Sequence, residues 1–511
     1  MGQQVNAASV EWNPSAERLR ELTEKMPNAT VTEFGNVNVK ARVDSRSARS
    51  TFIVDDSTNA TKQTIPRDEF NRIAAEQDSY IAGTHMVVVD GYIGSDPQFR
   101  TRARLVMEAA NANVAGMQKQ LYYPADEDYD PETWEPDTTV IYTPNLSAPG
   151  YPNDRVIAVD LAHNVTRVLN SDYFGESKKG GLRMWNNIVY NRGGLALHAG
   201  CKVIPVRGRP RSLLIVGLSG TGKTTTTFTT QLGSKPAQDD FLALMPGGKV
   251  YVTENGCFAK TFGLNPEYEP AIYHATIKPD AYLENVSVDA LGKVDFFDTS
   301  YTKNGRTTWP FKYVDPWPAQ QIPPAEFLLI LNRNENIVPG VARLDREQAA
   351  AYFMLGETTG TSAGGKDEEG KFLRVPGTNP FFPRDMADMG NRMLELLDSR
   401  ELKVFVLNTG RVGGGDDHEG SKKVSIPYSS AIVQAIVEDT ITWTSDPDFG
   451  YEIAESVPGV DDPEILQPRK LYARHGRMEE YNVMVARLKR ERREYLSSFA
   501  GLDEAIVKSM V

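Results

Sequence analysis

The stretch "LLIVGLSGTGKTTTTF" (213–228) joins an apolar run to glycines, one lysine and a row of threonines. Its centre, "GLSGTGKT" (217–224), matches G-x-x-x-x-G-K-[ST], a pattern that binds nucleoside triphosphates when a strand precedes it and a helix follows. The glycines let backbone N–H groups approach phosphate oxygens, and the helix start adds favourable electrostatics. Lys223 is predicted to reach the β- and γ-phosphates, and Thr224 to ligate the magnesium ion of the nucleotide. The alternative is a glycine-rich turn without a ligand.

Composition excludes several other classes of protein. The chain has 511 residues, enough for two to four domains, and a net charge of -12, which argues against broad nucleic-acid binding. Two cysteines cannot form a disulfide framework, and this fits a reducing compartment. The first residues show no apolar leader, and no run approaches the roughly 18 apolar residues of a membrane span. We therefore expect a cytoplasmic protein that binds neither membrane nor nucleic acid.

The apolar patterns predict alternating strands and helices. Strands are expected over 85–94 and 154–163, and helices over 97–117 and 478–496. After residue 200 four further runs read as strands: "SLLIVGL", "KVYVTENGC", "EFLLILN" and "KVFVLNTG". The glycine-rich, polar stretch 356–383 has no periodicity, and such a length is either disordered or a functional lid.

Three segments near the phosphate loop offer candidate ligands. "SDYFGESKKGG" contains Lys178 and Lys179, "GGLALHAG" contains His198, and "QDDFLAL" contains Asp239 and Asp240. An aspartate shortly after a phosphate loop is expected to bind the metal of the nucleotide. Taken alone, a histidine in an apolar run is more often a core residue than a ligand, and paired lysines are more often exposed. The residues by themselves leave these alternatives open.

Read together, these segments resemble ATP-dependent phosphoenolpyruvate carboxykinases, from about residue 40 to about residue 465. The similar motifs occur in family order: "VVVDGYIGSDPQFRTRARLVME", "YFGESKKGGLRMWN", "GLSGTGKTTTT", "QDD", "ENGCFAKT", "EPAIY", "LENV", "NGRTTWP", "LNTGRVGGG" and "KKVSI". The wording of the phosphate loop is that of the ATP-dependent class. The resemblance implies conversion of oxaloacetate and ATP to phosphoenolpyruvate, ADP and carbon dioxide, reversibly, with the gluconeogenic direction favoured.

The resemblance also implies two divalent cations. Decarboxylation leaves an enolate, whose negative oxygen needs a cation nearby. In the family this is Mn²⁺, and the positions of its ligands match Lys179, His198 and Asp240. Lys179 would ligate as the neutral amine, since burial beside a cation lowers the pKa of a lysine. Mg²⁺ is expected with ATP at Thr224.

Substrate and nucleotide residues are carried over from the same motifs. Arg46 matches the arginine that binds the substrate carboxylate, with Arg49 as a close alternative, and Tyr173 matches the tyrosine against substrate or carbon dioxide. Arg306 matches an arginine on the transferring phosphoryl group. The predicted nucleotide-binding residues are Gly217, Leu218, Ser219, Gly220, Thr221, Gly222, Lys223, Thr224, Thr225, Lys260, Glu269, Arg306, Lys423, Val424 and Ser429.

Some positions depart from the family pattern. Phe241 replaces a carboxylate that often follows the aspartate pair, Lys423 stands where arginine is usual, and 356–383 lacks the usual lysine. These departures leave room for a different phosphoryl donor. A related P-loop kinase, such as a protein serine kinase, and a non-catalytic nucleotide-binding regulator are the other hypotheses.

The predicted fold is α/β. We expect an N-terminal mixed-sheet domain over 1–195 on the substrate side. A C-terminal P-loop-containing domain over 196–511 would bind nucleotide and metal and carry a mobile lid over about 356–383. The active site is expected in the cleft between the two domains.

Overall fold

The computed structural model describes residues 5–57, 63–218, 220–359 and 371–510. They form two compact units. The first contains the residues up to Ile188 together with Thr253–Pro316, and the second contains Val189–Val252 and the described residues from Trp317 onward. The predicted boundary at 195/196 stays a prediction.

The first unit is built on a mixed sheet of nine strands among the described residues, in the order β1-β6-β7-β9-β11-β10-β4-β5, with β8 paired to β6. Its strands are β1 (Ser9–Trp12), β4 (Thr51–Val54), β5 (Thr64–Ile65), β6 (His85–Ile93), β7 (Thr101–Glu108), β8 (Tyr123–Pro124), β9 (Thr138–Thr143), β10 (Val156–Asp160) and β11 (Val165–Leu169). The strands predicted over 85–94 and 154–163 are thereby confirmed.

The helix predicted over 97–117 is wrong for its first half. Thr101–Glu108 is strand β7, antiparallel to β6, and a helix forms only after it. Asp90 and Arg104 face each other in this register and make a buried, bidentate ion pair of 2.8 Å. The run is buried on both faces, so its apolar residues carry no strand period, and long-range pairing overrides the local helical spacing.

A second sheet of the first unit has the order β18-β22-β19-β3-β2. Its strands are β2 (Ala29–Val31), β3 (Val37–Val39), β18 (Gly256–Lys260), β19 (Tyr282–Glu284) and β22 (Arg306–Pro310), and a separate pair is β20 (Ser287–Val288) with β21 (Val294–Asp295). The helices are α1 (Ala16–Glu24), α2 (Arg67–Ala82), α3 (Ala112–Leu121), α4 (Phe174–Asn191) and α6 (Pro270–Thr276). One apolar core joins Phe70, Ile73 and Ile81 of α2 to β6, β7, β9 and β10.

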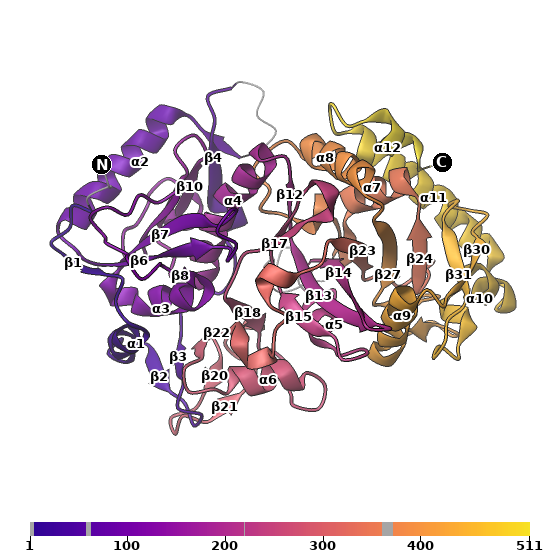
Figure 1. The fold of residues 1–511 in the computed structure, drawn as a ribbon, viewed down its shortest axis with the longest axis horizontal. Helices are drawn as coiled ribbons and strands as arrows, with labels where there is room; N and C mark the ends of the chain where they lie inside the picture. The colour runs from indigo at the N-terminus through magenta and orange to yellow at the C-terminus, as the bar shows by residue number, and fades with distance from the viewer. Residues whose placement is uncertain (1–4, 58–62, 219, 360–370, 511) are drawn as a thin grey trace. The chain divides into compact units, whose positions relative to one another are not determined.

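The second unit contains an eight-stranded sheet in the order β15-β13-β14-β23-β27-β24-β31-β30, whose central strands lie side by side in Figure 1. These strands are β13 (Ala199–Val206), β14 (Arg209–Val216), β15 (Lys235–Gln238), β23 (Ala325–Asn332), β24 (Val341–Leu344), β27 (Lys403–Asn408), β30 (Thr442–Ser445) and β31 (Glu452–Ser456). Smaller sheets are β12 (Leu195–Leu197), β16 (Leu242–Leu244) and β17 (Val250–Val252); β25 (Glu357–Thr359) and β26 (Phe372–Arg374); and β28 (Arg411–Val412) and β29 (Lys422–Lys423). The four strands predicted after residue 200 are confirmed as β14, β17, β23 and β27.

Helices cover this sheet. They are α5 (Lys223–Phe228), α7 (Arg346–Leu355), α8 (Met386–Ser399), α9 (Ile426–Glu438), α10 (Pro468–Arg474), α11 (Met478–Ser497) and α12 (Glu504–Lys508). The amphipathic helix predicted over 478–496 is confirmed as α11, which buries Tyr481, Val485 and Leu488. The α/β prediction is likewise confirmed at the level of a mixed α/β fold with several sheets.

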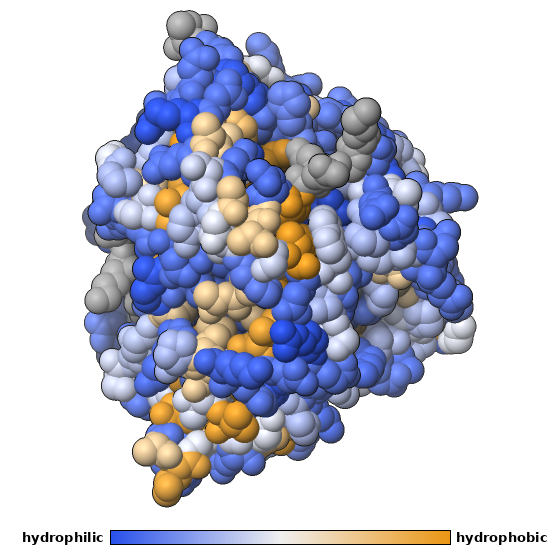
Figure 2. Space-filling view, turned by 90° about the vertical axis from the view of Figure 1, so that its left-hand side faces the viewer, coloured by the Kyte–Doolittle hydropathy of each residue, from blue (hydrophilic) through white to orange (hydrophobic). Residues whose placement is uncertain are grey.

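The face drawn in Figure 2 is predominantly hydrophilic, with apolar residues in small patches. The most exposed large apolar side chains are Leu291, Tyr268, Val483 and Phe297. Among the described helices, none combines the length and the apolar character that crossing a bilayer requires.

Candidate active site

The phosphate loop follows the C-terminal end of a buried strand in the second unit. Strand β14 ends at Val216 and helix α5 begins at Lys223. Gly220 and Gly222 adopt φ angles of 87° and 93°, a region that favours glycine. Thr409 Oγ1, just after β27, donates a hydrogen bond of 2.7 Å to the carbonyl of Thr221 and so fixes the loop. The predicted strand–loop–helix context is present, while Ser219 lies outside the described residues.

A cavity of about 190 Å³ opens beside this loop, within the second unit. Gly222 and Thr225 line it on the side of the loop, and Val424 and Ser429 line it on the side of α9. Together with Gly220 and Thr221, which also line it, six predicted nucleotide-binding residues therefore share one cavity. Lys423, also predicted to bind the nucleotide, is exposed and does not line it.

One carboxylate links the phosphate loop to the candidate histidine. Asp240 Oδ1 lies 2.7 Å from Lys223 Nζ and 2.9 Å from His198 Nε2. All three side chains are largely buried. The structure therefore brings together three residues that stand up to 42 positions apart (240 − 198) in the sequence.

The second nitrogen of His198 fixes the state of the ring. Nδ1–H donates a hydrogen bond of 2.7 Å to the carbonyl of Thr378, so Nε2 of a neutral ring carries the lone pair. A lone pair and a carboxylate oxygen 2.9 Å apart repel each other unless a proton or a cation stands between them. An imidazole nitrogen and a carboxylate oxygen that converge in this way fit a divalent transition-metal cation, and the backbone carbonyl is the usual partner of such a histidine.

Aromatic rings enclose this histidine. The ring of Phe241 lies 5.1 Å from that of His198, and the ring of Phe381 lies 5.9 Å away. Phe241, which replaces a carboxylate of the family pattern, is fully buried. It therefore serves as an apolar wall that lowers the local dielectric constant and strengthens the electrostatic interactions of Asp240.

In the first unit, both lysines of the "SKK" run are buried on α4. Lys178 is 2% exposed and Lys179 is 9% exposed, so the alternative of an exposed surface pair is wrong. Lys178 Nζ lies 2.9 Å from Glu254 Oε1. Lys178 thus has a carboxylate partner that neutralises its charge.

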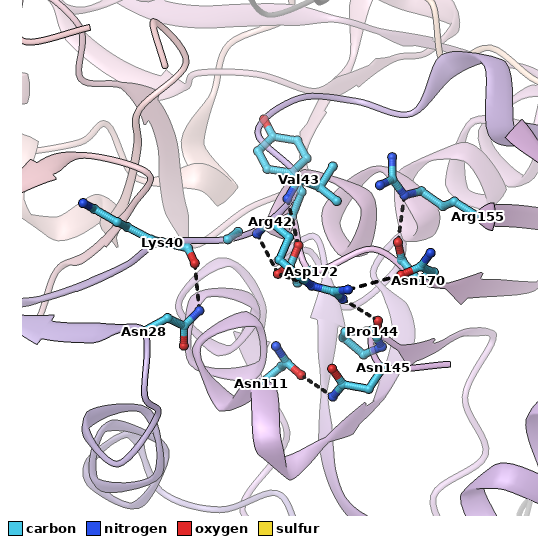
Figure 3. Close-up of polar contacts among 12 residues, drawn as sticks. Asn28, Lys40, Arg42, Val43, Asn111, Pro144, Asn145, Arg155, Asn170 and Asp172 are labelled. Carbon is cyan, nitrogen blue, oxygen red and sulfur yellow. Dashed lines mark hydrogen bonds and ion pairs between the residues drawn. The ribbon is translucent and has the colours of Figure 1, made fainter. Parts of the chain in front are cut away.

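The start of α4 and the residues before it hold the loop that carries Arg46. Asp172 accepts the backbone N–H groups of Arg42 at 2.8 Å and Val43 at 3.0 Å, and Figure 3 shows its carboxylate between them. Glu176 Oε1 accepts the backbone N–H of Ser47 at 2.6 Å. Two carboxylates therefore fix the loop on either side of Arg46.

The environments of the two candidate arginines differ. Arg46 is half-buried, whereas Arg49 is exposed in the short 3-10 helix Ala48–Ser50. Burial lowers the pKa of Arg183, and the charge of Arg46 adds to this effect, so the two guanidinium groups share one region. Arg183 is itself 3.5 Å from Glu176 Oε2, and the planar guanidinium of Arg46 suits an anionic carboxylate ligand.

Arg306 stands in the middle of a cross-strand row. The β18–β22 register pairs Lys260 with Arg306, and the β22–β19 register pairs Arg306 with Glu284. Side chains directly opposite in neighbouring strands lie on one face of the sheet. The guanidinium of Arg306 also lies 5.1 Å from the centre of the Phe258 ring, which is 6.3 Å from the ring of Tyr173.

Two groups in this region are held in their neutral forms. Burial raises the pKa of Glu284 to about 8, although its Oε1 accepts the backbone N–H of Phe174 at 2.8 Å. Burial also raises the pKa of Tyr173, whose hydroxyl accepts a hydrogen bond of 3.4 Å from Asn304. Arg306 is thereby left as a cation beside a neutral acid. Glu269 occupies the N-cap position of α6.

Sequence reasoning missed several residues that shape these sites. Glu254 and Glu284 lie in the runs "ENGCFAKT" and "LENV", which carry the resemblance but gave no role to either carboxylate. Thr378 contributes only its backbone carbonyl, so no side-chain signal could reveal it.

Comparison with known proteins agrees with this arrangement. The family model described as phosphoenolpyruvate carboxykinase matches residues 8–463. A phosphoenolpyruvate carboxykinase (ATP) of Aeropyrum pernix is 32% identical, over 98% of this chain and 96% of the relative. Those of Moorella thermoacetica and Bacillus mycoides are each 28% identical, over 99% and 98% of this chain and 97% and 96% of the relatives.

The chain belongs to the phosphoenolpyruvate carboxykinase family. The resemblance found in its motifs is confirmed, and so is the prediction that it is an enzyme, a carboxy-lyase of the ATP-dependent kind.

Proposed function

We propose that this chain converts oxaloacetate and ATP to phosphoenolpyruvate, ADP and carbon dioxide, reversibly and with the gluconeogenic direction favoured. The observation that carries the proposal is the contact of Asp240 with both Lys223 and His198, at 2.7 and 2.9 Å. One carboxylate thus contacts both the lysine of the phosphate loop and the histidine of the proposed cation-binding pair. A reaction that couples phosphoryl transfer to the formation of an enolate requires such proximity.

His198 and Asp240 would hold the enolate-side cation, which we propose is Mn²⁺, with Lys179 as the third ligand. Among the described residues, no group of three or more histidine, cysteine, aspartate or glutamate side chains could hold a metal ion, so a ligand of another type is needed. When bound, the cation stabilises the negative charge that develops on the enolate oxygen. The 9% exposure of Lys179 favours the neutral amine that ligation requires.

Arg46 would bind a carboxylate of oxaloacetate, and Tyr173 would lie against the substrate or carbon dioxide. The two backbone clamps formed by Asp172 and Glu176 support the choice of Arg46 over Arg49, because a substrate-binding arginine must be held in place. Tyr173 keeps its proton, since burial raises its pKa, and can therefore donate a hydrogen bond.

Phosphoryl transfer would depend on three cationic side chains. Lys223 would bind the β- and γ-phosphates, and Arg306 and Lys260 would bind oxygens of the transferring group. Such a group carries charge on its equatorial oxygens and is stabilised by cations placed in advance. The cross-strand pairing of Lys260 with Arg306 puts their two charges side by side.

Some of the remaining nucleotide contacts would be made by residues that line the cavity beside the loop, and others by residues outside it. Backbone N–H groups of 217–222, with Leu218 in this segment, would bind phosphates, and Thr224 would ligate Mg²⁺ with Thr225 beside it. Val424 and Ser429 would flank the adenine, Lys423 would contribute from the rim, and Glu269 would bind the ribose. The lid over about 356–383 stays a prediction, because residues 360–370 lie outside the described residues.

A coupled assay of phosphoenolpyruvate formation with ATP, GTP and pyrophosphate as rival donors tests the function. Formation with ATP at a rate well above the other two supports the proposal. A faster rate with GTP or pyrophosphate would indicate a different phosphoryl donor. ATP binding without decarboxylation in the presence of Mn²⁺ would favour a related kinase or a regulator.

A further inference from the structure

Lys202 is a buried lysine beneath the phosphate loop that the mechanism above does not use. It lies in β13 and has no exposed surface. Its ammonium donates hydrogen bonds to the carbonyls of Thr226 at 2.7 Å and Thr229 at 3.0 Å, and to Oε1 of Gln231. An ammonium has three N–H donors, so these three acceptors satisfy it completely.

These acceptors are neutral, which makes the position costly for a charged group. Burial lowers the pKa of Lys202 to about 7. An apolar residue of the same length would avoid the cost of burying an ammonium, but it would leave the two carbonyls and the amide oxygen without this donor. The lysine therefore has a role that depends on its three hydrogen bonds.

Gln231 connects Lys202 to helix α9 on the other side of the nucleotide cavity. Because its Oε1 accepts from the ammonium, its amide nitrogen must point the other way, and Nε2 donates a hydrogen bond of 2.9 Å to Ser430 Oγ in α9. Gln231 and Ser430 both line the cavity, as do Thr225 on the loop side and Ser429 on the side of α9. Figure 1 shows α5 and α9 at the same end of the sheet.

We propose that Lys202 is a positioning residue that joins the phosphate-binding helix α5 to the base-side helix α9 through Gln231 and Ser430. It touches no nucleotide. It fixes the end of α5 and the orientation of the Gln231 amide, and so it fixes the position of one wall of the cavity relative to the other. A nucleotide contacts both walls and therefore binds more tightly when the walls are held in this way. A bare polyphosphate contacts only the loop, so it gains no affinity from the link to α9.

The proposal rests on the proposed function only in assigning this cavity to the phosphoryl donor. It is tested by equilibrium binding of ATP and of tripolyphosphate, each with Mg²⁺, measured by isothermal titration calorimetry. Such binding does not depend on decarboxylation, so an enzyme that forms no phosphoenolpyruvate would leave this test intact.

Gln231→Leu is the decisive variant, because it retains the bonds of Lys202 to α5 and removes the link to α9. We expect it to weaken ATP binding about tenfold, as for loss of a hydrogen bond to a charged group, with tripolyphosphate binding unchanged. Lys202→Met should weaken the binding of both ligands, and that of ATP more strongly. KM for ATP should rise, and kcat should stay within about threefold of the wild-type value. The exposed Lys470 supplies the control, and Lys470→Met should change the affinity for neither ligand.

A double variant, Lys202→Met with Gln231→Leu, should bind ATP no more weakly than Lys202→Met alone, since both changes break one chain of contacts. The proposal is overturned if Gln231→Leu weakens ATP and tripolyphosphate equally, or if it leaves ATP binding at the wild-type level. The Gln231→Leu result stands even if Lys202→Met fails to fold.

Discussion

Lys178 Nζ lies 2.9 Å from Glu254 Oε1, and the two side chains are 1% and 6% exposed. An ion pair buried to this degree is destabilising once one partner is removed, because the other charge stays in an apolar environment. Lys178 is therefore not an inert neighbour of Lys179.

Lys178→Met should lower the free energy of unfolding by about 3 kcal/mol. The double variant with Glu254→Gln should recover most of that loss, because no unpaired charge is left. Urea unfolding followed by circular dichroism measures both. A Lys178→Met protein as stable as the wild type would show that Glu254 does not depend on this partner.

Lys223→Met should abolish turnover with ATP and yet increase the affinity for Mn²⁺. Its ammonium lies 2.7 Å from Asp240 Oδ1, so it competes with a cation for the same oxygen. Electron paramagnetic resonance titration of free Mn²⁺ measures the affinity. Lys179→Arg is the opposite control and should lose Mn²⁺ affinity, because a guanidinium keeps its protons. A lower Mn²⁺ affinity in Lys223→Met would contradict the shared position of Asp240.

Asp172→Asn should raise KM for oxaloacetate about tenfold and leave KM for ATP unchanged. Asp172 accepts backbone N–H groups of Arg42 and Val43 with separate oxygens, and an asparagine amide can accept only one of them. The loop that carries Arg46 would then lose one of its fixed points, at a cost of about 1–3 kcal/mol. Steady-state kinetics with each substrate varied separates the two constants. Equal changes in both would point to general loss of structure.

Glu284 makes stability depend on pH. Burial raises its pKa to about 8 from an unfolded value of 4.5, so the folded chain binds one more proton than the unfolded chain between these limits. Stability from this group is fully present below about pH 4.5 and declines as pH rises toward 8, with a slope of about 1.4 kcal/mol per pH unit. Glu284→Gln should remove this slope, as urea unfolding at a series of pH values would measure. Parallel pH profiles for the two proteins would contradict the neutral state of Glu284.

Arg492 and Glu357 form a second buried pair, in the second unit, with both side chains 2% exposed and Arg492 also bonded to Tyr352. Arg492→Met should lower the free energy of unfolding by about 3–5 kcal/mol. Arg490 is exposed on the same helix α11, and Arg490→Met should have an effect within about 0.5 kcal/mol. Similar thermal midpoints for the two variants would overturn the role of the pair.

Local patterns were sufficient to predict the phosphate loop and the strands around it. The sequence 213–228 contains its own strand, turn and helix start, and β14 and α5 form there as expected. Local spacing misses strand β7, whose residues are almost all buried and pair with β6 and β9. Local spacing cannot report such pairing.

The candidate site likewise divides into residues that local motifs predict and contacts that depend on the fold. Lys223 was predicted from its motif, whereas the contact of His198 with Asp240 depends on where β12 ends and β16 begins. The burial of Lys178 and Lys179 could not be predicted from the pair itself, since burial is decided by what packs on α4. Backbone groups such as the Thr378 carbonyl leave no trace in the side-chain sequence.

The discontinuity of the first unit has a consequence for how the chain is made. Strand β3, near the N-terminus, pairs with β19, and the N–H of Ala41 donates to Asn285 Oδ1 across a separation of 244 residues. During synthesis the earlier strands must wait at least ten seconds or so for their partners, at roughly 5–20 residues per second. Until then their edges lie open to other chains. A nascent chain stalled before residue 282 should therefore depend on chaperones, and a fragment ending near residue 195 should be insoluble even though it contains the nine-stranded sheet.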